Sequence, residues 1–206
     1  MIARMMAYAL LVAVMAATPF AAAEAQLGRD MDARYHLDRR YNDNSANPFA
    51  WLFGARRSSS PISRATVAFS GPYQPGTIIV NTAERRLYLV TAPGAALRYG
   101  IGVGRIGFTW AGTTAISAKR EWPDWTPPDQ MLRRRPELPR HMAGGIENPL
   151  GARAMYLGSS LFRIHGSNEP ETIGQAVSSG CFRMTNEDVI DLYDRVGVGT
   201  RVVVLR

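Results

Sequence analysis

Short apolar runs separated by turn residues constrain the fold of this chain more than any other feature. From Thr77 onward, runs of four to seven residues alternate with Gly, Pro and Asn. This spacing is typical of strands in a mainly β domain. We expect strands over residues 77–81, 85–91, 97–103, 113–119, 154–157, 161–165 and 202–205. The Pro-, Gly- and Arg-rich stretch 121–152 predicts a long irregular loop, and loops of that length are usually functional.

One helix is expected near the C terminus. Thr185 and Asp188 form a capping pattern, and apolar residues then recur at helical spacing from Val189 to Val196. Gly197 ends the helix. The fold class predicted from the residues is therefore mainly β with one clear helix.

The chain has a single cysteine, Cys181, so an intramolecular disulfide framework and a Cys-rich zinc site are excluded. With 206 residues, 46% of them hydrophobic, the chain is long enough to bury a core without such staples. It holds only three histidines: His36, His141 and His165. We therefore expect no metal and no cofactor.

Residues 1–25 are typical of a secretory signal peptide. Arg4 is followed by the uncharged stretch Met5–Ala23, and Ala23-Glu24-Ala25 supplies a small-x-small cleavage pattern. We expect cleavage after Ala25, which would leave no stable membrane span; the alternative is an uncleaved membrane anchor. The net charge of +7 suggests an anionic neighbour, such as an acidic polymer.

Residues 26–76 are predicted to be a flexible N-terminal linker, because their apolar residues are sparse and aperiodic. A short helix at 48–53 is an alternative within this stretch. One folded domain is expected over 77–206. No groove-binding helix carries the scattered arginines, so we expect no nucleic-acid partner.

The string Gly102–Gly107 matches the dinucleotide-binding pattern G-x-G-x-x-G. That motif requires a helix directly after it, so that the helix N terminus meets the pyrophosphate. Here a Phe-Thr-Trp-Ala-Gly stretch follows, which suits a turn and a strand. We reject a nucleotide site.

The segment Ser178-Ser179-Gly180-Cys181 predicts a tight turn that carries the lone thiol. Backbone N–H groups of Gly180 and Cys181 could point at a substrate carbonyl, as in an oxyanion hole. His165 lies 16 residues upstream at the end of an expected strand. A loop that folds back would bring its imidazole to the thiol.

A thiol with a pKa near about 8.5 is mostly protonated at neutral pH, so a nucleophilic cysteine needs a partner. His165 could take the thiol proton and later give it to a leaving amine. A third group must orient the imidazole. The Gly166 carbonyl and the hydroxyls of Ser167 and Ser178 are the candidates, and the sequence does not choose among them.

The stretch His165–Met184 resembles the signature of the YkuD-type (ErfK/YbiS/YcfS/YnhG) L,D-transpeptidases of bacterial cell walls. That signature is His-Gly-Thr/Ser, a loop, Ser-His-Gly-Cys, an apolar residue, Arg or Asn, and an apolar residue. The likeness covers roughly 77–206. Further matching segments are 81–103, 122–128 and 148–153. The resemblance implies that family's β-sandwich-like catalytic-domain fold.

The resemblance also implies a reaction. Cys181 would attack the third residue of a peptidoglycan stem peptide, release the terminal D-alanine and form an acyl-enzyme. An amine acceptor would resolve this thioester, which cross-links the wall or anchors a lipoprotein or outer-membrane protein. His165 would be base and then acid, and Gly166 would orient its ring. Ser178 and Gly180 would shape the oxyanion site.

Four residues are expected to bind substrate: Arg183, Ser167, Trp122 and Trp125. Arg183 could hold a carboxylate through a bidentate pair; the alternative is a structural salt bridge. The tryptophans could line a groove, or they could pack the loop against the domain. The sequence departs from the family at Ser179, where histidine is frequent. Because His165 is the family's base, we expect activity to survive.

Two other functions remain open. Water could resolve the thioester, which would make the chain an L,D-carboxypeptidase or amidase. A non-catalytic wall-binding module would also suit the charge and the tryptophans, but it has no need of a thiol beside a histidine. The resemblance and the signal peptide imply the periplasm of a Gram-negative bacterium. The resemblance and the thiolate argument together predict acylation by carbapenems.

Overall fold

The computed structural model describes residues 19–45 and 60–206. Most of the predicted signal peptide and the alternative helix at 48–53 lie outside these residues. The helices are α1 (Pro19–Ser45), α2 (Asp129–Arg134), the 3-10 turn η1 (Pro170–Thr172) and α3 (Asn186–Arg195). The strands are β1 (Ala65–Ala68), β2 (Ile78–Asn81), β3 (Arg86–Ala92), β4 (Ala95–Gly100), β5 (Val103–Gly104), β6 (Gly112–Glu121), β7 (Arg153–Leu157), β8 (Arg163–His165), β9 (Ala176–Ser178), β10 (Phe182–Arg183) and β11 (Arg201–Leu205).

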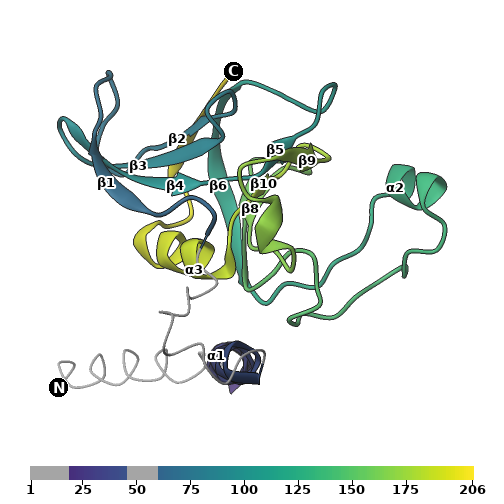
Figure 1. Cartoon of the computed structure of the whole chain (residues 1–206). Coiled ribbons are helices and arrows are strands. Elements are labelled where there is room, and N and C mark those ends of the chain that lie inside the picture. Colours follow the sequence, from purple (N-terminus) through teal and green to yellow (C-terminus); the bar gives the residue numbers. More distant parts are fainter. Residues whose placement is uncertain (1–18, 46–59) are drawn as a thin grey trace, which may run out of the picture.

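The strands form one continuous nine-stranded sheet in the order β1-β4-β3-β2-β11-β6-β7-β8-β10 (Figure 1). Most neighbours are antiparallel, but β2 pairs in parallel with β11, and β8 pairs in parallel with β10. Strands β5 and β9 form a separate parallel pair. These parallel pairs join segments far apart in the sequence, so the chain must close over itself before the sheet is complete.

The main core is a cluster of buried apolar side chains between the sheet and α3. Tyr99, Met155 and Phe182 are among its fully buried members, and α3 contributes Val189 and Leu192. A smaller cluster around Ile79, Val90 and Val203 covers the opposite face of the sheet. Both faces of the central strands are therefore buried, which is why strands such as 202–204 are apolar at every position.

The sequence predicted the mainly β class and the C-terminal helix, and both are confirmed. Thr185 caps α3, since its hydroxyl accepts a hydrogen bond from the Asp188 N–H at 3.3 Å. Each expected strand range overlaps an observed strand, but 97–103 is split between β4 and β5. The Gly102–Gly107 string leads through a turn toward β6 without a helix, as its rejection required.

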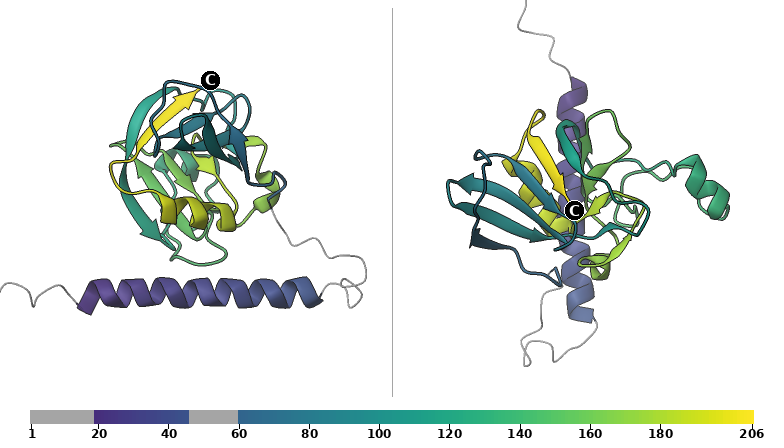
Figure 2. Two further views of the ribbon diagram at one scale, coloured as in Figure 1. Left: turned by 90° about the vertical axis from the view of Figure 1, so that its left-hand side faces the viewer. Right: turned by 90° about the horizontal axis from the view of Figure 1, so that it is seen from above.

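The irregular loop at 121–152 is also present, and α2 is the one helix within it. Figures 1 and 2 show α2 projecting away from the body of the domain. None of its residues is buried.

The predicted flexible linker at 26–76 differs from the structure in the parts that are described. Residues 65–68 form β1, which pairs antiparallel with β4, so the sheet begins before Thr77. An edge strand needs only one row of hydrogen bonds, and the burial of β1 alternates along its length. Residues 26–45 belong to α1. The apolar pattern did not predict this helix, because α1 has few apolar residues. Its contacts with the domain are mostly polar.

Helix α1 lies along one side of the domain (Figure 2). Asp32 accepts hydrogen bonds from the Arg153 guanidinium, at 2.5 and 3.0 Å, and from the Trp122 indole at 2.9 Å. Tyr35 donates to Glu187 at 2.6 Å. Arg153 is almost wholly buried, and Asp32 supplies most of the negative charge beside it. Within residues 19–45 and 60–206, no helix is long and apolar enough to cross a membrane.

We predict that Asp32→Ala lowers the free energy of unfolding by about 1–3 kcal/mol, because it leaves the buried Arg153 guanidinium without its closest carboxylate. Urea unfolding at neutral pH measures this change. Asp30→Ala is the matched control: it is the same substitution on the same helix, at an exposed residue whose carboxylate accepts a hydrogen bond from Gln26. Equal losses of unfolding free energy in the two variants would show that the contact between Asp32 and Arg153 does not stabilise the fold.

Candidate active site

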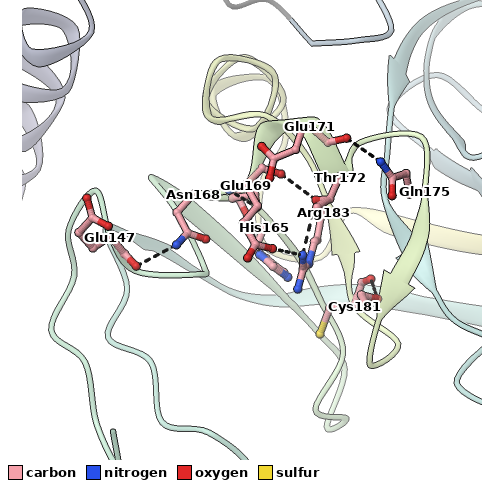
Figure 3. A network of polar contacts seen from close by, with 12 residues as sticks. Glu147, His165, Asn168, Glu169, Glu171, Thr172, Gln175, Cys181 and Arg183 are labelled. Carbon is pink, nitrogen blue, oxygen red and sulfur yellow. Dashed lines mark hydrogen bonds and ion pairs between the residues drawn. The ribbon is translucent and has the colours of Figure 1, made fainter. Parts of the chain in front are cut away.

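Parallel pairing of β8 and β10 places the candidate nucleophile and the candidate base on the same face of neighbouring segments. In this register Ile164 lies beside Phe182, and His165 lies beside Arg183. Ile164 and Phe182 point into the core. Since side chains alternate along a strand, His165 and Arg183 lie on the opposite face, and so do the preceding Arg163 and Cys181. Figure 3 shows Cys181 and His165 beside Arg183 on this face.

The turn before Cys181 is held by one hydroxyl. Ser178 Oγ donates to the Cys181 carbonyl at 2.7 Å and accepts from the Gly180 N–H at 3.1 Å. Gly180 has a φ of +109°, and a Cβ there would lie 2.6 Å from the Phe162 ring. Only glycine fits this backbone. The sequence expectation placed the Gly180 N–H toward a substrate carbonyl; in this structure it is engaged by Ser178 instead.

The Cys181 thiol is neutral at physiological pH. Burial raises its pKa above the ordinary value, because the thiolate loses hydration, and the positive charges of Arg163 and Arg183 offset part of that rise. The Sγ atom lies 3.7 Å from the Leu161 carbonyl oxygen, which accepts its hydrogen bond.

The His165 imidazole is also neutral. Its Nδ1 lies 2.6 Å from the Gly166 carbonyl oxygen. A carbonyl can only accept, so Nδ1 carries the proton and Nε2 is left to accept one. Burial, together with the charge of Arg183, lowers the pKa of His165 to about 3. Of the three candidates for orienting the ring, the Gly166 carbonyl is the group in contact with it.

Arg183 forms a salt bridge. Its guanidinium lies 2.9 Å from a Glu169 carboxylate oxygen and 3.5 Å from the Thr172 hydroxyl (Figure 3). This is the alternative that the sequence left open beside carboxylate binding. Glu169 is half exposed, so the pair lies at the rim of the site, where a substrate carboxylate could compete for Arg183.

The other predicted substrate-binding residues are turned into the protein. Ser167 is buried, and its hydroxyl accepts from the Glu169 N–H at 3.0 Å. Trp122 is buried against α1, and Trp125 is buried where its backbone bridges Met142. The two indoles pack the long loop onto the domain, which is the alternative that the sequence left open beside a substrate groove.

Two residues near the thiol were missed by sequence reasoning. Glu169 is the partner of Arg183, and only the tertiary fold brings its loop to β10. Arg163 lies two residues before His165, so strand alternation could have placed it on the site face. Its position beside Cys181 depends on the register of β8 and β10 and could not be read from the sequence. Among the described residues, no group of His, Cys, Asp and Glu side chains could hold a metal ion.

Comparisons with known proteins agree on one family. The model of the L,D-transpeptidase catalytic domain, YkuD, matches residues 75–204. A probable L,D-transpeptidase ErfK/SrfK of Escherichia coli is 36% identical over 78% of this chain and 53% of its own length. A probable L,D-transpeptidase YbiS of Escherichia coli is 40% identical over 61% of this chain and 43% of its own. The chain thus spans about half the length of these curated relatives.

A solved structure of an L,D-transpeptidase from Mycobacterium smegmatis superposes with a TM-score of 0.51 at 17% identity. It covers 63% of this chain and 58% of that chain. At this identity the likeness concerns the fold alone, and it agrees with the mainly β architecture described above.

We predict that stability falls as pH drops below about 6.5, in a way that depends on His165. The unfolded chain binds a proton at its histidine near that pH, whereas the native imidazole stays neutral down to a pKa of about 3. At pH 5 this difference corresponds to about 2 kcal/mol. Urea unfolding of wild type and His165→Asn at pH 7 and pH 5 measures it.

The matched control is His141→Asn, because the His141 side chain is 57% exposed. This variant should keep the pH dependence of the wild type. A His165→Asn variant with the wild-type dependence would mean that the native imidazole titrates normally.

Proposed function

Because the chain belongs to the L,D-transpeptidase catalytic-domain family, we propose that it is an exported cysteine transpeptidase acting on peptidoglycan stem peptides in the periplasm of a Gram-negative bacterium. The observation that carries the proposal is the pairing of β8 with β10. It sets the lone thiol and a neutral, correctly protonated imidazole on one face of adjacent strands.

In the first half-reaction, Cys181 Sγ attacks the carbonyl carbon of the third stem residue. An S–C bond forms, and the C–N bond to the terminal D-alanine breaks. Nε2 of His165 accepts the thiol proton and gives it to the leaving amine. The product is a thioester on Cys181 and free D-alanine.

In the second half-reaction, an amine of the acceptor attacks the thioester carbon. A C–N bond forms, the S–C bond breaks, and the amine proton returns through His165 to the thiolate. A second stem peptide as acceptor gives a cross-link, whereas a lipoprotein or outer-membrane protein as acceptor anchors that protein to the wall.

The oxyanion that develops on the attacked carbonyl needs donors close to Sγ. The Cys181 N–H is the first candidate, because Ser178 occupies the N–H of Gly180 in this structure. Ser178 also holds the Cys181 carbonyl, so one side chain fixes the backbone on both sides of the thiol. A small rotation of this hydroxyl would release the Gly180 N–H as a second donor.

The thiol and the imidazole are both neutral, so the ion pair is not formed in advance. Proton transfer to His165 therefore accompanies the attack on the substrate. This arrangement protects the half-buried thiol from adventitious alkylation and oxidation, because the reactive thiolate is scarce until substrate arrives.

Hydrolysis at the same site is the second candidate, since water in place of the acceptor amine would give an L,D-carboxypeptidase or amidase. The exposed rim formed by Arg183 and Glu169 favours a site open to more than one acceptor. The products of the reaction distinguish the two activities.

We predict that the wild type forms a covalent adduct with disaccharide-tetrapeptide and with a carbapenem, and that Cys181→Ala forms neither. Intact-mass analysis detects the adduct, and separation of the products detects dimers linked through third residues. Ser179→Ala is the control, because Ser179 is exposed and should acylate like the wild type. Tripeptide without dimers would favour the hydrolase, and no adduct with either compound would favour a wall-binding module.

We also predict how acylation depends on pH. Because the proposed reactive form is the neutral thiol beside the neutral imidazole, the rate of carbapenem acylation should stay nearly constant between pH 6 and pH 8, where the raised pKa of Cys181 keeps the thiol protonated. No loss of rate near pH 6.5 is expected, since His165 stays neutral to a pKa of about 3. Stopped-flow measurement of acylation across this range checks both points. A rate that rises about tenfold per pH unit across this range would contradict the proposed proton transfer, because it would mean that the free thiolate attacks without His165.

A further inference from the structure

Arg163 is a half-buried cation that the proposed reaction does not yet use. It lies on β8, with Tyr156 as its Cα partner on β7. Its guanidinium carbon lies 5.2 Å from the centroid of the Tyr156 ring. Its Nε is buried without a hydrogen-bond partner. None of the ion pairs found in residues 19–45 and 60–206 includes Arg163, whereas the neighbouring Arg183 has Glu169.

The register places Arg163 directly beside the thiol. Because Ile164 pairs with Phe182 in a parallel ladder, the preceding residues, Arg163 and Cys181, are neighbours across the two strands. Alternation directs both side chains to the face opposite Ile164 and Phe182. The four polar side chains of this face thus form two cross-strand pairs, Arg163 with Cys181 and His165 with Arg183.

The Arg163 guanidinium is partly buried, and no carboxylate of the described residues pairs with it. A partly buried charge without a counter-charge is costly, and the face of an aromatic ring offsets only part of that cost. Among the described residues, the charged groups that act on the thiol are Arg163 on β8 and Arg183 on β10, and His165 lies on the same face of β8. His165 is neutral, and Glu169 largely compensates Arg183. Arg163 is the uncompensated charge.

We propose that Arg163 is an electrostatic positioning residue that stabilises the Cys181 thiolate as it forms. Stacking on Tyr156 holds the guanidinium in place. The negative charge that develops on Sγ then becomes the counter-charge of Arg163. The same cation disfavours protonation of His165 from outside the pair, so the imidazole stays available as the base.

The electrostatics of the site support this assignment. The charge of Arg163 and hydrogen bonds from its backbone and side chain all lower the pKa of Cys181, against the rise caused by burial. The charge of Arg163 also contributes to the lowered pKa of His165. The inference rests on the proposed function for the role of the thiolate in catalysis, but its test needs no substrate.

The test is the pH profile of Cys181 alkylation by iodoacetamide. Cys181 is the only cysteine, so every alkylated molecule reports this thiol. Removing a nearby positive charge typically raises a pKa by about one unit or more. We expect Arg163→Gln to shift the midpoint upward by about one pH unit and to slow alkylation at pH 7 about tenfold. Arg163→Lys, which keeps the charge, should stay close to the wild type.

Arg201→Gln is the control, because Arg201 is exposed on β11 and should leave the profile unchanged. Arg163→Met preserves packing on Tyr156 and replaces the Gln variant if that variant does not fold. Wild-type profiles in the charge-free variants would overturn the proposal, as would an equal shift in Arg163→Lys. A shifted profile in a chain that forms no acyl-enzyme would retain this inference and reject the proposed function.

Discussion

The parallel pairing of β8 with β10 is the interaction on which the rest of the site depends. It is only two residue pairs long, yet it fixes which side chains share a face. Ile164 and Phe182 anchor both strands in the core, and their burial leaves no freedom to slip by one residue. A one-residue slip would turn Cys181 inward and remove the thiol from the imidazole. The packing of these two core residues thus fixes the geometry of the candidate site.

The charges around that pair are distributed unequally. Glu169 compensates Arg183 at the rim, whereas Arg163 lies beside the thiol with no carboxylate partner among residues 19–45 and 60–206. Burial keeps the thiol and the imidazole neutral, so the free protein holds no preformed ion pair. The site therefore combines a resting state of low reactivity with a cation placed where negative charge would appear.

Helix α1 adds a second polar contact between distant segments. Asp32 provides the close counter-charge for Arg153, a residue buried on β7 beside the strand that carries His165. Trp122, for which the sequence left a substrate groove and loop packing open, donates to the same carboxylate. The Asp32 side chain thus contacts both the start of the long loop and β7, the strand next to the one that carries His165. These contacts make α1 part of the domain's packing.

The sequence by itself determined the mainly β class, the C-terminal helix, the rejection of a nucleotide site and the family, because these depend on local periodicity and on a contiguous motif. It also offered His165, Gly180 and Cys181 as candidate site residues, because the proposed chemistry needs the first and last of these types and a positive φ favours glycine. Tertiary structure decided the rest. The partner of Arg183, the orientation of Trp122 and the place of Arg163 all depend on register and on contacts between distant segments. The docking of α1 could not be predicted from the sequence for the same physical reason. An ion pair between residues 32 and 153 produces no hydrophobic periodicity in either segment.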